Sequence, residues 1–182
     1  MRTIFAIFAA TVLLGNSTPS AEYLNRNWAV AESGRSCTLI GFFEGKKILW
    51  LQYNDPLDKA LVTLTDDAFG SAEAGKQYMV RLDFVQGDGF SKRYPSQVFS
   101  AVSRGEANGI ERSFPGTIFL EYLASSDILG VTLENGPVLA SLNLRGSSRA
   151  VYALRRCAKR VGEIFPSDPL EGAEIPRIPR PL

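Results

Sequence analysis

The alternation of apolar and polar positions predicts a chain built mostly from short β-strands. Runs rich in β-branched and aromatic residues are separated by turns that contain Gly, Asn, Asp or Pro, which is the pattern of antiparallel strands. The expected strands cover residues 28–30, 37–43, 48–53, 60–64, 78–84 and 97–102. We therefore predict a mainly β (α+β) fold, an antiparallel β-sandwich or barrel.

The pattern changes after Pro115. Residues 117–124 predict a short helix, although a run of eight residues is also compatible with a strand. Residues 128–134 and 138–144 flank Asn135-Gly136-Pro137 and predict a β-hairpin. The last patterned segment places its apolar residues on one helical stripe: Ala150, Val151, Leu154, Cys157, Ala158 and Val161. This stripe predicts a C-terminal helix packed on the sheet.

The first residues have the pattern of a secretory signal peptide. Arg2 precedes the apolar run 4–14, and small and polar residues follow up to Ala21. Eleven apolar residues span only about 16 Å as a helix, against about 30 Å for the hydrocarbon core of a bilayer. A mature N-terminal helix or anchor is the alternative. We predict a signal peptide over residues 1–21, cleavage after Ser20 or Ala21, a periplasmic or secreted protein, and no transmembrane segment in the mature chain.

The C-terminal end differs from the rest in composition. Five prolines fall within the last 17 residues, which end in IPRIPRPL, and such a segment favours an extended conformation over a helix. We expect one β-rich domain over residues 22–163 and a Pro-rich flexible tail over 164–182. A docking peptide around Pro176 and Pro179 is the alternative for the tail.

The two cysteines, Cys37 and Cys157, agree with export. In an oxidising compartment, two cysteines most simply form one disulfide. Two separate buried thiols are the alternative. A catalytic thiol is less favoured still, because the chain contains no histidine to act as its base.

Composition excludes several functions. Without histidine, Ser-His-Asp and Cys-His mechanisms are unavailable, and so is the commonest zinc ligand. The chain has 20 basic and 19 acidic residues, and losing Arg2 with the leader leaves 19 of each, so we expect no nucleic-acid partner. We also expect no metal site and no cofactor.

Paired carboxylates are the remaining catalytic option. The candidate pairs are Asp66 with Asp67, Asp55 with Asp58, and Asp83 with Asp88. Sequence spacing does not place any pair at the separation that acid–base hydrolysis needs. We interpret these residues as parts of solvated turns, with an envelope hydrolase or a hydrolase inhibitor as the alternative function.

The turn before the C-terminal helix carries the most distinct polar motif. Gly146 permits a sharp turn, and Ser147 or Ser148 can cap a helix that begins near Arg149. The alternative is an anion-binding site formed by Arg145, Ser147, Ser148 and Arg149. The wider basic arc consists of Arg145, Arg149, Arg155, Arg156, Lys159 and Arg160. It is either a solvated helix face or a patch for an acidic partner, lipid or polysaccharide.

Several stretches resemble one family. Trp28-Ala29-Val30 followed by Cys37-Thr38-Leu39 is similar to the opening of proteins related to invasion-associated locus B. The C-terminal stretches TIFLEYLA, ILGVTLENG and VLASLNLRGSSRAVYAL resemble the end of that family, a hairpin and a Leu-x-Leu-x-Gly turn into a helix. The resemblance implies an exported bacterial protein of mostly β architecture without an assigned enzymatic activity. We expect a non-catalytic domain that binds an envelope protein or an anionic surface component.

Overall fold

A computed structural model describes residues 21–33, 36–70, 72–104 and 107–164, and strands are the main element of these residues. The elements are β1 (Ala21–Tyr23), β2 (Trp28–Ser33), β3 (Ser36–Phe42), β4 (Ile48–Asn54), β5 (Lys59–Thr65), β6 (Gln77–Val85), β7 (Ser91–Arg104), β8 (Ala107–Pro115), α1 (Gly116–Ser125), β9 (Ile128–Leu133), β10 (Val138–Asn143) and α2 (Ser147–Ile164). Apart from Ala21 and Ile164, the predicted leader and Pro-rich tail lie outside the described residues.

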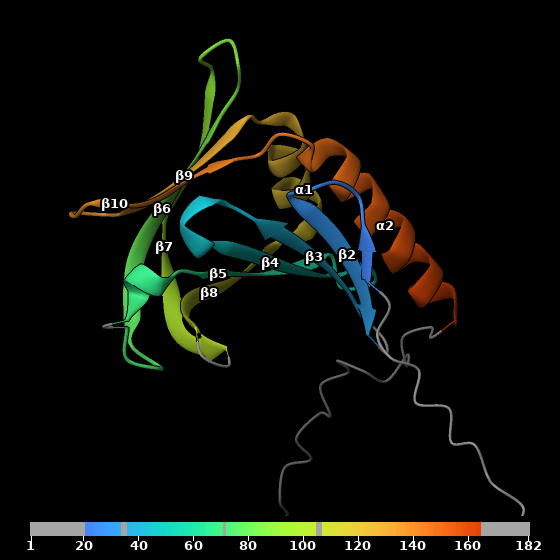
Figure 1. The fold of residues 1–182 in the computed structure, drawn as a ribbon, viewed down its shortest axis with the longest axis horizontal. Coiled ribbons are helices and arrows are strands. Elements are labelled where there is room, and N and C mark those ends of the chain that lie inside the picture. Colours follow the sequence, from blue (N-terminus) through green and yellow to red (C-terminus); the bar gives the residue numbers. More distant parts are fainter. Residues whose placement is uncertain (1–20, 34–35, 71, 105–106, 165–182) are drawn as a thin grey trace, which may run out of the picture.

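The strands form one antiparallel sheet in the order β1-β2-β3-β4-β5-β8-β7-β6-β9-β10. Within the described residues, β1 and β10 each pair with one neighbour only, so they are the edges. The sheet bends, and β6, β9 and β10 run in a different direction from β2, β3, β4 and β5 (Figure 1). The predicted hairpin around Asn135 is confirmed as β9 and β10.

The alternation of side chains gives this sheet a continuous apolar face. Leu39, Leu51 and Val62 lie opposite one another across β3, β4 and β5. On the other half of the sheet, Leu82 and Val131 lie opposite one another across β6 and β9. All five side chains are buried, so the bent sheet surrounds one core.

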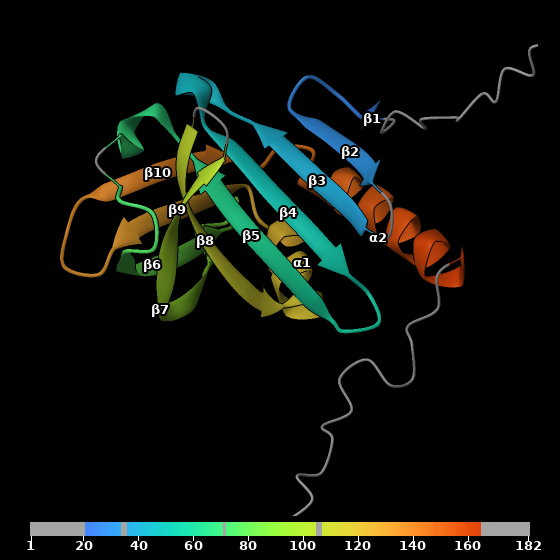
Figure 2. The same ribbon diagram turned by 90° about the horizontal axis from the view of Figure 1, so that it is seen from below.

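Both helices cover the apolar face of the sheet (Figure 2). Phe119 of α1 is fully buried, and its ring lies 4.8 Å from that of Phe114 and 5.6 Å from that of Phe84 between centroids. Helix α2 packs against α1, β2 and β3. Its buried residues include the whole predicted stripe: Ala150, Val151, Leu154, Cys157, Ala158 and Val161. The predicted class, mainly β with a C-terminal helix packed on an antiparallel sheet, is confirmed.

The predicted disulfide between Cys37 and Cys157 is also confirmed. Cys37 lies on the inner face of β3 and Cys157 on the buried stripe of α2, with 6.0 Å between their Cα atoms. They are 120 positions apart in sequence. The bond therefore joins the helix at the end of the domain to a strand near its beginning.

The sequence interpretation missed β1, β8 and the first half of β7. In the sequence, Asn108-Gly109 has the pattern of a turn, but both residues lie within β8. Gly109 is close to the backbone of β5, because a Cβ at this position would lie 2.7 Å from the carbonyl oxygen of Leu64. Glycine there permits a close backbone approach within a strand. In β7, Pro95 lies where the register with β6 shifts, and proline is tolerated at such irregularities.

Helix α1 begins without a capping side chain of its own, because Pro115 is at its N-cap position. Asp58, in the turn between β4 and β5, supplies the cap. Its Oδ1 atom accepts hydrogen bonds from the backbone nitrogen of Thr117 at 2.6 Å and from the Thr117 hydroxyl at 2.8 Å. Its carbonyl oxygen accepts a third bond from the nitrogen of Gly116 at 2.7 Å. The turn therefore fixes the start of α1.

We expect Asp58→Ala to lower the free energy of unfolding by about 1–2 kcal/mol, because the backbone N–H and the hydroxyl of Thr117 lose their acceptor. Urea unfolding followed by circular dichroism measures the change. Asp58→Asn keeps an oxygen acceptor and tolerates the positive φ of 44° at this position, so it should lose less. Equal losses in the two variants would contradict a capping role.

Candidate binding surfaces

The structure gives the candidate carboxylates partners that stabilise the fold. Asp66 pairs with Lys47 at 3.2 Å, and the neighbouring Asp67 pairs with Lys46 at 2.8 Å. These two ion pairs connect the segment after β5 to the β3–β4 connection.

The second candidate pair, Asp55 and Asp58, is likewise engaged in local structure. Asp55 accepts a hydrogen bond from the hydroxyl of Tyr53 at 2.9 Å, while Asp58 caps α1. Burial and the hydrogen bond to Asp55 raise the pKa of Tyr53 to about 12. The pair thus anchors the β4–β5 turn.

The third pair is divided between a strand and a turn. Asp83 on β6 accepts from Arg81 at 3.0 Å and from Arg93 at 2.5 Å. Asp88 accepts from the backbone nitrogen of Phe90 at 2.9 Å within the β6–β7 turn. Burial opposes ionisation of Asp83, but the hydrogen bonds and charges of the two arginines outweigh it and lower its pKa.

This lowered pKa predicts an acid-dependent contribution to stability. A carboxyl whose pKa is lower in the folded state stabilises the fold above its unfolded pKa of about 4, and the contribution disappears as pH falls through the folded pKa. We expect Asp83→Asn to be less stable than the natural protein at pH 7, with the difference shrinking below about pH 4. Urea unfolding across this range measures it, with Asp88→Asn as control. A difference independent of pH would contradict the assignment.

The four residues of the predicted anion site do not converge. Helix α2 begins at Ser147, two positions before the expected start, and the buried Ser147 hydroxyl donates to the carbonyl oxygen of Leu123 in α1 at 2.7 Å. That hydroxyl joins the two helices. Arg145 and the exposed Arg149 line different grooves, and Ser148 is exposed and lines neither groove.

The turn before α2 is shaped by contacts with the N-terminal part of the domain. The indole nitrogen of Trp28 donates to the carbonyl oxygen of Arg145 at 3.0 Å. Gly146 has a φ of 88°, and a Cβ there would lie 2.7 Å from Nδ2 of Asn25. Glycine is therefore required for the turn that directs α2 across the sheet.

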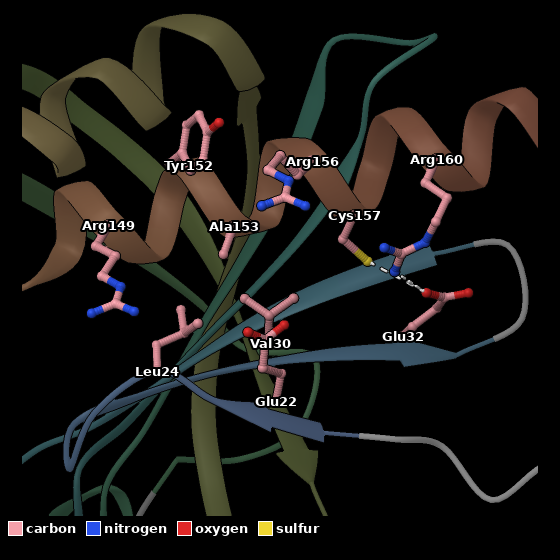
Figure 3. A pocket seen from close by; sticks show the side chains of 10 residues that line it. All are labelled: Glu22, Leu24, Val30, Glu32, Arg149, Tyr152, Ala153, Arg156, Cys157 and Arg160. Carbon is pink, nitrogen blue, oxygen red and sulfur yellow. Dashed lines mark hydrogen bonds and ion pairs between the residues drawn. The ribbon is translucent and has the colours of Figure 1, made fainter.

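One groove lies between α2 and the inner face of β1 and β2 (Figure 3). We call it the arginine groove; its volume is about 380 Å³. Its lining residues are Glu22, Leu24, Val30, Glu32, Arg149, Tyr152, Ala153, Arg156, Cys157 and Arg160. The strands and the β1–β2 connection supply two carboxylates and two apolar side chains, and α2 supplies three guanidinium groups.

The charges of the arginine groove are only partly compensated. Arg160 pairs with Glu32 at 2.5 Å, and the guanidinium carbon of Arg156 lies 5.9 Å from the ring centroid of Tyr152. Within the described part of the chain, Arg149 and Arg156 have no carboxylate partner. Two exposed guanidinium groups are therefore available to an anionic ligand.

A second groove, of about 800 Å³, lies between the edge strand β10 and the β3–β4 connection. Phe42, Phe43, Val138 and Leu139 contribute apolar surface to it. Its charged lining residues are Glu44, Lys47 and Arg145, and Lys47 is already paired with Asp66. The net charge of this groove is therefore small.

The sequence identified the basic residues of the arginine groove but not its other wall. Glu22 lies on β1, a strand that the sequence interpretation missed, and Leu24 lies in the connection that follows it. Glu32 lies on β2, beyond Val30, where this strand was expected to end. No local pattern relates them to α2. The signal that could have placed the wall is the Cys37–Cys157 bond, because β3, which carries Cys37, pairs with β2.

No family model, curated protein or solved structure matches this chain. Across the described ranges, no helix has the length and apolar character needed to cross a membrane. The same residues contain no group of three or more His, Cys, Asp or Glu side chains that could hold a metal ion.

Proposed function

We propose that this protein is an exported, non-catalytic binding domain of the bacterial envelope, and that the arginine groove is its binding surface. The observation that carries the proposal is the pair of exposed arginines, Arg149 and Arg156, which have no carboxylate partner among the described residues. Charged groups that are left uncompensated on a concave surface favour a ligand of opposite charge.

Three further observations support the proposal. Disulfides persist mainly in oxidising compartments, so the Cys37–Cys157 bond is compatible with export. The resemblance to proteins similar to invasion-associated locus B implies the same location and a function without catalysis. The candidate carboxylates form contacts within turns, between strands and at the start of a helix. This structural use supports a binding function over a hydrolase activity.

Export is tested by expressing the full chain in a bacterial host and measuring the mass of the protein recovered from the envelope fraction. We expect cleavage between Ser20 and Glu22, which leaves Ala21 or Glu22 as the N-terminal residue. A recovered protein that retains Met1 would contradict export.

Binding is tested by placing a photo-crosslinking amino acid at Tyr152, which lines the arginine groove and is 64% exposed. The control is the same substitution at Phe90, which is 57% exposed in the β6–β7 turn and does not line the groove. In living cells we expect a discrete adduct from position 152 that is absent from position 90. No adduct at position 152, or the same adducts at both positions, would contradict the proposal.

A further inference from the structure

The three arginines of the groove form a row along α2. At 100° per residue, Arg149, Arg156 and Arg160 fall within about 40° of one another around the helix. Arg149 and Arg156 are separated by seven residues, or about 10.5 Å along the helix axis. Arg155 and Lys159 lie roughly 100° away from this row and do not line the groove. Helix α2 therefore carries two groups of basic side chains, one that lines the arginine groove and one that lies outside it.

The opposite wall restricts what can bind. Glu22 and Glu32 place carboxylates on the strand side of the groove, and Glu32 already neutralises Arg160. On the same side, the partly buried Leu24 adds a small apolar surface, whereas Val30 is only 6% exposed. A suitable ligand presents anionic groups to α2 and apolar groups to the strands, and it keeps its negative charge away from Glu22.

This arrangement favours a protein segment over a lipid surface. A membrane is broad and uniformly anionic, so it would contact the exposed Arg155 and Lys159 as well as the exposed Arg149 and Arg156. It would also meet the carboxylate of Glu22 at the groove. A polypeptide can place carboxylates on one side only, and a guanidinium group binds a carboxylate through two parallel hydrogen bonds.

We propose that the arginine groove receives an acidic segment of a partner protein, with two carboxylates about 10 Å apart that pair with Arg149 and Arg156. This inference rests on the proposed binding function and specifies the class of partner. The apolar side of the segment contacts Leu24. Arg160 remains paired with Glu32 and holds the strand wall beside the helix.

The test uses a fluorescently labelled twelve-residue peptide in which glutamate and alanine alternate, so that an extended chain carries carboxylates on one side and apolar groups on the other. Binding is followed by fluorescence anisotropy at low ionic strength. The test variant is Arg149→Glu/Arg156→Glu. The matched control, Arg155→Glu/Lys159→Glu, makes the same change in net charge on the same helix outside the groove. Circular dichroism and thermal unfolding confirm that both variants fold.

We expect the natural protein to bind the probe, the groove variant to bind at least about tenfold more weakly, and the control to stay within about threefold. Equal weakening in both variants would overturn the proposal, because net charge alone would explain binding. Absence of binding by the natural protein, or an unaffected groove variant, would also overturn it.

Vesicles containing phosphatidylglycerol form the second arm. We expect any binding of the natural protein to these vesicles to be weakened at least as much by Arg155→Glu/Lys159→Glu as by Arg149→Glu/Arg156→Glu. Vesicle binding that is lost on Arg149→Glu/Arg156→Glu but retained in the control would assign the groove to lipid and overturn the proposal. If the peptide fails while crosslinking at position 152 persists, the binding function stands and only the acidic partner is rejected.

Discussion

Cys157→Ser is expected to lower the free energy of unfolding by about 2–5 kcal/mol. The disulfide spans 120 positions and restricts the unfolded chain, and a loop of about 100 residues corresponds to roughly 4.7 kcal/mol in the chain-entropy description. In the folded state, the bond holds α2 against β3, and both sulfur-bearing residues are buried. Urea unfolding under non-reducing conditions measures the loss.

The double variant Cys37→Ser/Cys157→Ser is the control, because it removes the same bond without leaving a free thiol. We expect both variants to lose similar stability, and we expect a reducing agent to destabilise only the natural protein. A Cys157→Ser variant as stable as the natural protein would show that α2 is held in place without the bond.

The second large effect is expected from Trp28→Ala, which should lower the free energy of unfolding by about 3–5 kcal/mol. Trp28 is fully buried, and its ring packs edge-on against Phe43 with 5.6 Å between ring centroids. Its indole nitrogen also holds the carbonyl of Arg145 in the turn before α2. The substitution therefore removes core volume and a contact that orients the C-terminal helix.

The chain provides a matched control in its other tryptophan. Trp50 on β4 lies opposite Ile40 and Thr63, on the face of the sheet away from the helices, and it is only partly buried. We expect Trp50→Ala to cost less than Trp28→Ala in the same unfolding measurement. An equal or larger loss at Trp50 would mean that the outer face of β3, β4 and β5 is packed more tightly than the core beside α2.

Local patterns were sufficient to predict most of the fold. Alternation identified six strands, and the 3.6-residue spacing from Ala150 to Val161 identified the buried side of α2. Because that stripe contains Cys157, the sequence alone indicated that α2 crosses the sheet near Cys37. Strand β8 was missed because the reason for Gly109 lies in the backbone of β5, which is distant in sequence.

The candidate site was predicted only in part, because it depends on contacts between distant segments. The sequence identified Arg149, Arg156 and Arg160 as basic positions of one helix, but Glu32, the partner of Arg160, lies 128 positions away. The predicted grouping of Arg145 with Arg149 assumed that neighbours in sequence share a surface. The turn at Gly146 instead leaves them lining two different grooves.

The most direct test of the binding surface is nuclear magnetic resonance of the side-chain Nε–Hε groups of arginine during titration with the alternating glutamate–alanine peptide. The proposed surface predicts that the signals of Arg149 and Arg156 shift together and saturate, while the signal of Arg155 on the same helix stays nearly unchanged. Equal shifts at Arg155, or shifts confined to Arg145 in the second groove beside β10, would contradict the arginine groove as the binding surface of this protein.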